Sequence, residues 1–183
     1  HPDALPGSPP LGRGPRPLAG VVEDLAFAGN YVYVALGQGG LAVLDISRPE
    51  APRLVDTDET DGVTDELAVA GDYLYRVDSF SALRVMDIRD RAHPVQTGFY
   101  RAEINAYGLA IAGETAYISD FHAGLRRIDI SDPTDPTQIS AYEPGDFSKA
   151  LAIQGDMAYL STSDAFLRAI DLSDPAAPVA RGI

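Results

Sequence analysis

The most acidic stretch of the chain runs from residue 56 to residue 66 and reads Asp-Thr-Asp-Glu-Thr-Asp-Gly-Val-Thr-Asp-Glu. Calcium prefers carboxylate oxygens on a flexible loop, and a glycine allows the sharp turn that such a loop needs. The candidate calcium ligands are Asp56, Asp58, Asp61 and Asp65. The spacing Asp-x-Asp-x-x-Asp-Gly is one residue longer than the EF-hand pattern, so the other interpretation is a solvated acidic loop without a metal.

Known catalytic patterns are absent from the sequence. It contains no Gly-x-Ser-x-Gly, no His-Glu-x-x-His and no Gly-Lys-Ser/Thr. It contains no cysteine either, which excludes thiol catalysis and thiolate metal sites. Pairs of carboxylates are common in a chain with 27 acidic residues, so they do not by themselves indicate a hydrolase. His93 and His122 fall at turns, where we expect both side chains on the surface.

The overall charge excludes one class of partner. The formal net charge of the 183 residues is −13, whereas a nucleic-acid-binding surface needs clustered Lys and Arg. No apolar run reaches the roughly 18 residues of a membrane-spanning helix. Hydrophobic residues make up 45% of the chain, which is typical of a globular domain. We therefore expect one folded domain that neither binds nucleic acid nor spans a membrane.

The elements that position these residues follow from an internal repeat of 42 residues. The period continues through four copies without insertion or deletion. Such a period must be recognised before the fold is assigned, because each copy is one structural unit. The residues that recur at this step are Gly29, Gly71, Gly113 and Gly155; Tyr33, Tyr75, Tyr117 and Tyr159; Leu41, Leu83, Leu125 and Leu167; Asp45, Asp87, Asp129 and Asp171; Pro52, Pro94, Pro136 and Pro178.

Each copy has the pattern of four short strands. In the first copy we expect strands at 25–28, 31–34, 41–46 and 53–55, and a two-residue hairpin turn at Gly29-Asn30. The third copy has Gly113-Glu114 at this turn, which is weaker turn chemistry. We expect the repeated tyrosines to pack between copies, with their hydroxyls bonded to a partner. Four strands per 42 residues predict an all-β fold, a β-propeller of four four-stranded blades.

The segment that follows each third strand begins with the repeated Asp, as in Asp45-Ile-Ser-Arg-Pro. A single Asp-x-Ser could suggest an active-site fragment. An Asp side chain also accepts hydrogen bonds from backbone N–H groups two or three residues later. Four copies at a fixed spacing favour this structural role.

The repeat unit resembles the LVIVD repeat of bacterial and archaeal extracellular and surface proteins. Leu41-Ala-Val-Leu-Asp45 and Leu125-Arg-Arg-Ile-Asp129 occupy the position of the motif that names it. The resemblance covers residues 20 to 183 and implies a β-propeller and an exported location, with no enzymatic activity. The second copy departs from the pattern, because Arg91 replaces a proline.

Domain organisation follows the phase of the repeat. Residues 1–19 are rich in Pro and Gly and are expected to form an extended arm. Residues 20–183 form the propeller domain, with blades at about 20–57, 58–99, 100–141 and 142–183. Each copy runs from an inner to an outer strand. The propeller is therefore a closed four-bladed ring, half of an eight-bladed ring made by two chains, or part of a larger propeller.

These observations favour a non-enzymatic binding or self-assembly module. Exposed blade faces would be apolar and would bind a protein partner or a second chain. The chain begins at His1 rather than Met, as removal of a signal peptide would leave it, so we expect a secreted or cell-surface protein. The alternative is a carboxylate- or metal-dependent hydrolase or lyase with its site in the channel or on the top loops. Calcium is the one cofactor that the sequence suggests.

Overall fold

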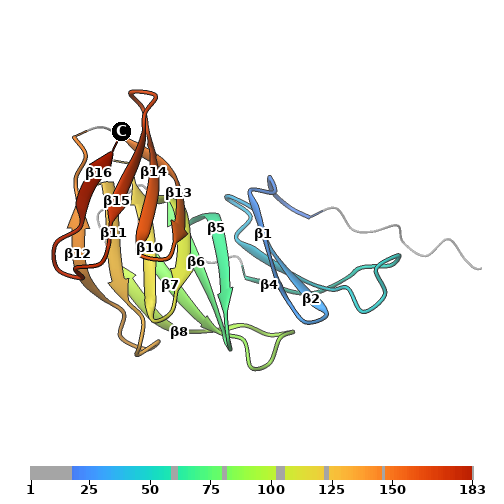
Figure 1. The fold of residues 1–183 in the computed structure, drawn as a ribbon. Coiled ribbons are helices and arrows are strands. Elements are labelled where there is room, and N and C mark those ends of the chain that lie inside the picture. Colours follow the sequence, from blue (N-terminus) through green and yellow to red (C-terminus); the bar gives the residue numbers. More distant parts are fainter. Residues whose placement is uncertain are drawn as a thin grey trace, which may run out of the picture.

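The computed structural model describes residues 18–58, 62–79, 82–101, 106–121, 124–145 and 147–182. Within these residues the fold is all-β, and no helix could cross a membrane. Sixteen strands form four antiparallel sheets of four strands each, in chain order (Figure 1). The predicted architecture of four four-stranded blades is confirmed.

The strands of the first two sheets have the following bounds. The first sheet contains β1 (Asp24–Ala28), β2 (Tyr31–Ala35), β3 (Leu41–Asp45) and β4 (Arg53–Asp58). The second sheet contains β5 (Val63–Ala70), β6 (Tyr73–Ser79), β7 (Ala82–Asp87) and β8 (Val95–Arg101).

The last two sheets repeat this order. The third sheet contains β9 (Ala106–Ala112), β10 (Thr115–Asp120), β11 (Gly124–Asp129) and β12 (Thr137–Tyr142). The fourth sheet contains β13 (Ser148–Gln154), β14 (Met157–Thr162), β15 (Leu167–Asp171) and β16 (Val179–Gly182).

The turns have the local chemistry that the repeat predicts. Gly29 has a φ of 58°, and its three equivalents have φ between 56° and 59°, while the residue after each glycine has no positive φ. Glycine is therefore needed only at the first turn position, and Glu114 fits as well as Asn or Asp at the second.

At the end of the third strand, the backbone N–H of Ser47 donates to the Asp45 carboxylate at 2.8 Å and lowers the pKa of Asp45. The same contact recurs at Asp87, Asp129 and Asp171.

Consecutive sheets pack through two different faces. One face carries the repeated tyrosine and leucine and is called here the tyrosine face. The opposite face, rich in Leu, Ile and Val, is called the aliphatic face. At the first interface, Tyr33 and Leu41 of the first sheet pack against Leu67, Leu74 and Ile88 of the second. The tyrosine face of the second sheet meets the aliphatic face of the third, and that of the third meets the fourth, in the same way.

The four sheets form an open arc. Strands β1 and β2 contact β5, strands β5 and β6 contact β9, and strands β9 and β10 contact β13. In the described part of the chain, these extensive contacts join consecutive sheets only. The first sheet lies at one end of the arc and the fourth at the other (Figure 1). Of the predicted arrangements, a closed four-bladed ring is therefore not the one seen.

Candidate functional site

The acidic stretch from 56 to 66 is not one loop, contrary to the sequence prediction. Asp56 and Asp58 lie in β4, where they pair with Val43 and Leu41 of β3. Asp65 lies in β5. The prediction failed because β4 continues along the whole of β3, beyond a bulge that the sequence pattern does not reveal.

The candidate calcium ligands have partners of other kinds. Asp56 accepts a hydrogen bond from the backbone N–H of Thr57 at 2.9 Å and lies 3.2 Å from the exposed Nδ1 of His93. Asp58 forms an ion pair with Arg76, at 3.1 Å. Arg76 lies in β6 and His93 in the turn that precedes β8, so both carboxylates contact the second repeat unit.

Calcium binding itself stays a prediction. Asp61 lies outside the described residues, as do His1 and His122. Within the described ranges, no group of three or more His, Asp or Glu residues could hold a metal ion.

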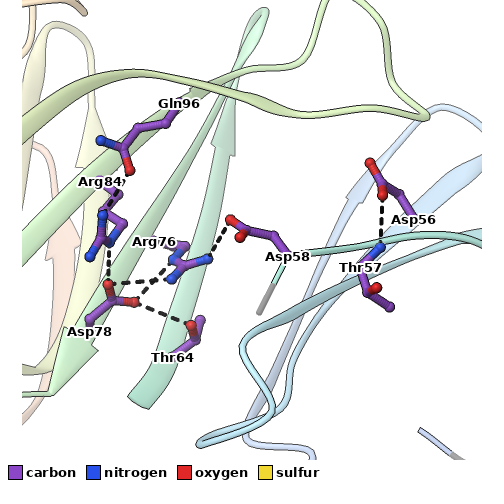
Figure 2. Close-up of polar contacts among 8 residues, drawn as sticks. All are labelled: Asp56, Thr57, Asp58, Thr64, Arg76, Asp78, Arg84 and Gln96. Atoms are coloured by element: carbon purple, nitrogen blue, oxygen red, sulfur yellow. Dashed lines mark hydrogen bonds and ion pairs between the residues drawn. The ribbon is translucent and has the colours of Figure 1, made fainter. Parts of the chain in front are cut away.

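A polar cluster that the sequence analysis missed lies between the first two sheets (Figure 2). Its centre is Asp78, which is fully buried and accepts hydrogen bonds from Thr64 at 3.2 Å and from Arg76 Nε at 3.0 Å. Arg84 forms a second ion pair with Asp78 and donates to the side-chain oxygen of Gln96 at 2.8 Å. Arg76 is fully buried as well, and it reaches across to Asp58 of the first sheet.

Part of this cluster belongs to the repeat. In the third sheet, Arg126 pairs with the Asp120 carboxylate at 2.8 Å and donates to Gln138 at 2.8 Å. These residues follow Arg84, Asp78 and Gln96 by 42 positions. Such a recurrence indicates a structural role.

Arg76 is the residue of the cluster that escapes the repeat. Its equivalents are Val34, Ile118 and Leu160, all apolar. The sequence signal that could have revealed Arg76 is a charged residue at a position that is apolar in the other three copies. Arg76 is buried and bonded to Asp58 of the first sheet and Asp78 of the second, so it links the two sheets.

Glu66 of the inner strand β5 lies near the same interface and interacts electrostatically with Asp24 and Asp65. Burial, together with the negative charges of Asp24 and Asp65, raises the pKa of Glu66 to about 7. Asp24 of β1 also accepts a hydrogen bond from the backbone N–H of Leu67 in β5, at 2.8 Å. We therefore expect the packing of the first two sheets to depend on pH.

The tyrosine face of the fourth sheet is open. Leu167 is 59% exposed, whereas its equivalents Leu41, Leu83 and Leu125 are at most 1% exposed. Tyr159 is half-buried, whereas the other three repeated tyrosines are buried. The difference arises because each of the other three tyrosine faces is covered by the next sheet.

The aliphatic face of the first sheet is exposed along β1 only. On the same face, Val32, Val34 and Ala42 of β2 and β3 are buried and pack with Leu18. Leu25 and Phe27 of β1 are 48% and 61% exposed. Leu67, the equivalent of Leu25, is buried against the first sheet. Val69, the equivalent of Phe27, packs partly buried in the same interface. In the part of the chain that the structure describes, the arc therefore has exposed apolar side chains at both ends, from β15 on the tyrosine face of the fourth sheet and from β1 on the aliphatic face of the first.

Comparison with known families agrees with the repeat. The model of the LVIVD repeat matches residues 19–60, 61–102, 105–143 and 145–183. The chain belongs to the LVIVD repeat family. A comparison with curated proteins gave no match.

Two computationally designed proteins with crystal structures share the fold. Ika8 is 12% identical, with a TM-score of 0.69, over 87% of this chain and 47% of its own. Ika4 is 13% identical, with a TM-score of 0.67, over 89% of this chain and 95% of its own. This chain of LVIVD repeats thus spans about half the length of Ika8. At these identities the likeness concerns the fold alone.

Proposed function

We propose that this LVIVD-repeat protein is a non-enzymatic, exported self-assembly module that associates through the open sheet faces at the two ends of its arc. The observation that carries the proposal is the exposure of Phe27 and Leu167 at positions whose equivalents are covered in every internal interface. Contiguous apolar surface rimmed by polar residues is typical of protein interaction sites.

The energetic argument rests on the size of the exposed side chains. Fully burying a Leu or Phe side chain contributes about 1.5–3 kcal/mol. Leu25, Phe27 and Leu167 are each about half exposed, so covering both ends removes substantial apolar area from water. The buried polar cluster supports the same role, because it holds the first sheet in place as a platform.

Solution mass tests the assembly. Sedimentation velocity of the wild-type chain should show masses above 19.5 kDa that increase with concentration. The double variant Phe27→Glu/Leu167→Glu should stay at the monomer mass, because each glutamate places a charge in an open face. Val95→Glu is the matched control, since Val95 is similarly exposed but lies on the outer strand β8. A double variant that associates like the wild type would contradict the proposal.

The proposed location is the cell surface or the surrounding medium. It is supported by the resemblance to the LVIVD repeat of exported proteins and by a net charge of −13, which favours solubility. Protease added to intact cells that produce the protein naturally should degrade it, or the medium should contain it. Full protection until the cells are lysed would contradict this location.

A further inference from the structure

Each internal interface also has a contact at the outer strands, beside the apolar faces, which is called here the rim contact. Every outer strand has a β-bulge at the same position of the repeat. The residue after the bulged position lies against the turn that precedes the outer strand of the next sheet. At Gly98 of β8, a Cβ atom would lie 1.9 Å from the carbonyl oxygen of Pro133. At Ser140 of β12, the equivalent position, the hydroxyl donates to the carbonyl of Pro175 at 2.8 Å.

The same turn contacts the tyrosine in the first interface. The hydroxyl of Tyr33 donates to the backbone carbonyl of Arg91 at 3.0 Å. Arg91, Pro133 and Pro175 are equivalent residues of the second, third and fourth sheets. The carbonyl at this position is therefore an acceptor or a close neighbour of the preceding sheet in all three interfaces.

At each end of the arc, one side of the rim contact is present without the other side. Gly182 of β16 is the equivalent of Gly98 and Ser140, and no atom lies near the Cβ position that it leaves open. Pro49 is the equivalent of Pro133 and Pro175 and belongs to the first sheet. Tyr159, the equivalent of Tyr33, lies on the open tyrosine face of the fourth sheet. The two ends thus carry complementary rim residues, beside the exposed apolar side chains of β1 at one end and of β15 at the other.

We infer that the occupant of each open face is a second copy of this chain, packed head to tail. The tyrosine face of the fourth sheet covers the aliphatic face of the first sheet in the other copy, and two chains close a ring of eight sheets. Gly182 then receives the Pro49 carbonyl of the other copy as Gly98 receives that of Pro133. The inference rests on the proposed function and names its partner.

A second copy can cover both open ends while the arc of each chain stays intact. The fourth and first sheets of one chain lie at opposite ends of the arc, so neither covers the other (Figure 1). Two arcs joined head to tail keep the internal interfaces and bury both kinds of face twice, with two-fold symmetry. The chain matches about half of Ika8, so this fold occurs within a chain about twice as long.

Complementation between two single variants tests the head-to-tail arrangement. Phe27→Glu blocks the aliphatic face of the first sheet, and Leu167→Glu blocks the tyrosine face of the fourth. Each variant alone should be monomeric, because every interface needs one intact face of each type. An equimolar mixture should form a dimer of one chain of each kind, since one matched pair of faces is intact. The measurement is native mass spectrometry with one variant isotopically labelled, together with sedimentation velocity.

The rim contact has its own test. Gly182→Leu should weaken association at least tenfold, because its side chain would occupy the space of the Pro49 carbonyl. Gly182→Ser should associate like the wild type, since Ser140 occupies the equivalent position in an internal interface. Circular dichroism of each variant should match the wild type, because Gly182 contacts no neighbouring sheet in the arc.

The outcomes separate this inference from the proposed function. Dimers formed by either single variant alone would indicate pairing of like faces, and would overturn the head-to-tail arrangement while leaving the proposed function intact. Failure of the mixture to form dimers would also overturn it. Wild-type masses above two chains would indicate a filament or a larger ring and would overturn the two-chain closure. A wild-type chain that stays monomeric at every concentration would overturn both proposals.

Discussion

Replacing Arg76 by leucine should destabilise the interface between the first two sheets. The leucine side chain fits the site, because Leu160 occupies the equivalent position in the fourth sheet. The substitution makes this position apolar, as it is in the other three copies. It also leaves the carboxylates of Asp78 and Asp58 without the guanidinium that pairs with them. The effect should come from these two carboxylates rather than from packing.

The magnitude follows from burial. Removing one partner of a buried ion pair costs about 3–5 kcal/mol, because the other charge stays buried. Asp78 is fully buried but keeps Thr64 and Arg84, and Asp58 is partly exposed and can be hydrated. We therefore expect a loss near the lower limit, about 3 kcal/mol in the free energy of unfolding.

Urea unfolding monitored by circular dichroism measures the loss. The wild type and the variant should be compared in the Phe27→Glu/Leu167→Glu background, which keeps association from contributing to stability. Arg91→Ala removes a more exposed ion pair with Asp72 and serves as the control, with an expected cost below about 1 kcal/mol.

A compensating variant separates charge from structure. Arg76→Val, Asp78→Leu and Arg84→Ala together copy the residues of the first sheet and should recover most of the stability, since apolar side chains can replace a buried ionic group without loss. If Arg76→Leu costs no more than Arg91→Ala, the cluster does not hold the sheets together and the reasoning is refuted.

Three further variants test other contacts. The raised pKa of Glu66 means that the folded protein holds this proton more tightly than the unfolded chain does, so stability should fall as pH rises from about 4.5 to about 7. Glu66→Gln should remove this pH dependence, which thermal unfolding at pH 4 to 8 measures. Tyr33→Phe removes the hydroxyl that donates to the next sheet and should cost about 1 kcal/mol in urea unfolding, whereas an unchanged midpoint would contradict the contact. Gly98→Ala forces a Cβ against the Pro133 carbonyl and should cost about 1–3 kcal/mol, and a neutral result would show that the third sheet moves freely.

The strands and turns could be predicted from the sequence because their chemistry is local and appears four times. A glycine with positive φ at the hairpin turn and an Asp that accepts a backbone N–H recur in every copy. Even so, the prediction for Gly113-Glu114 was too cautious, because the second turn position has no positive φ. The internal repeat thus predicts what all copies share.

The candidate site could be predicted only in part, because it depends on contacts between copies. The pairing of Arg76 with Asp58 requires knowledge of which face of the second sheet meets the first. The acidic stretch was interpreted as a loop because its residues are polar, yet Asp56 and Asp58 continue the outer strand beyond its bulge. Open blade faces were expected from the phase of the repeat, but the register of the rim contact at Gly182 required the structure.

The mass of the wild-type chain in solution tests the central claim most directly. Sedimentation equilibrium at neutral pH, over a hundredfold range of concentration, should converge on twice the 19.5 kDa mass of one chain and rise no further. A mass that stays at 19.5 kDa over the whole range would contradict assembly through the open faces.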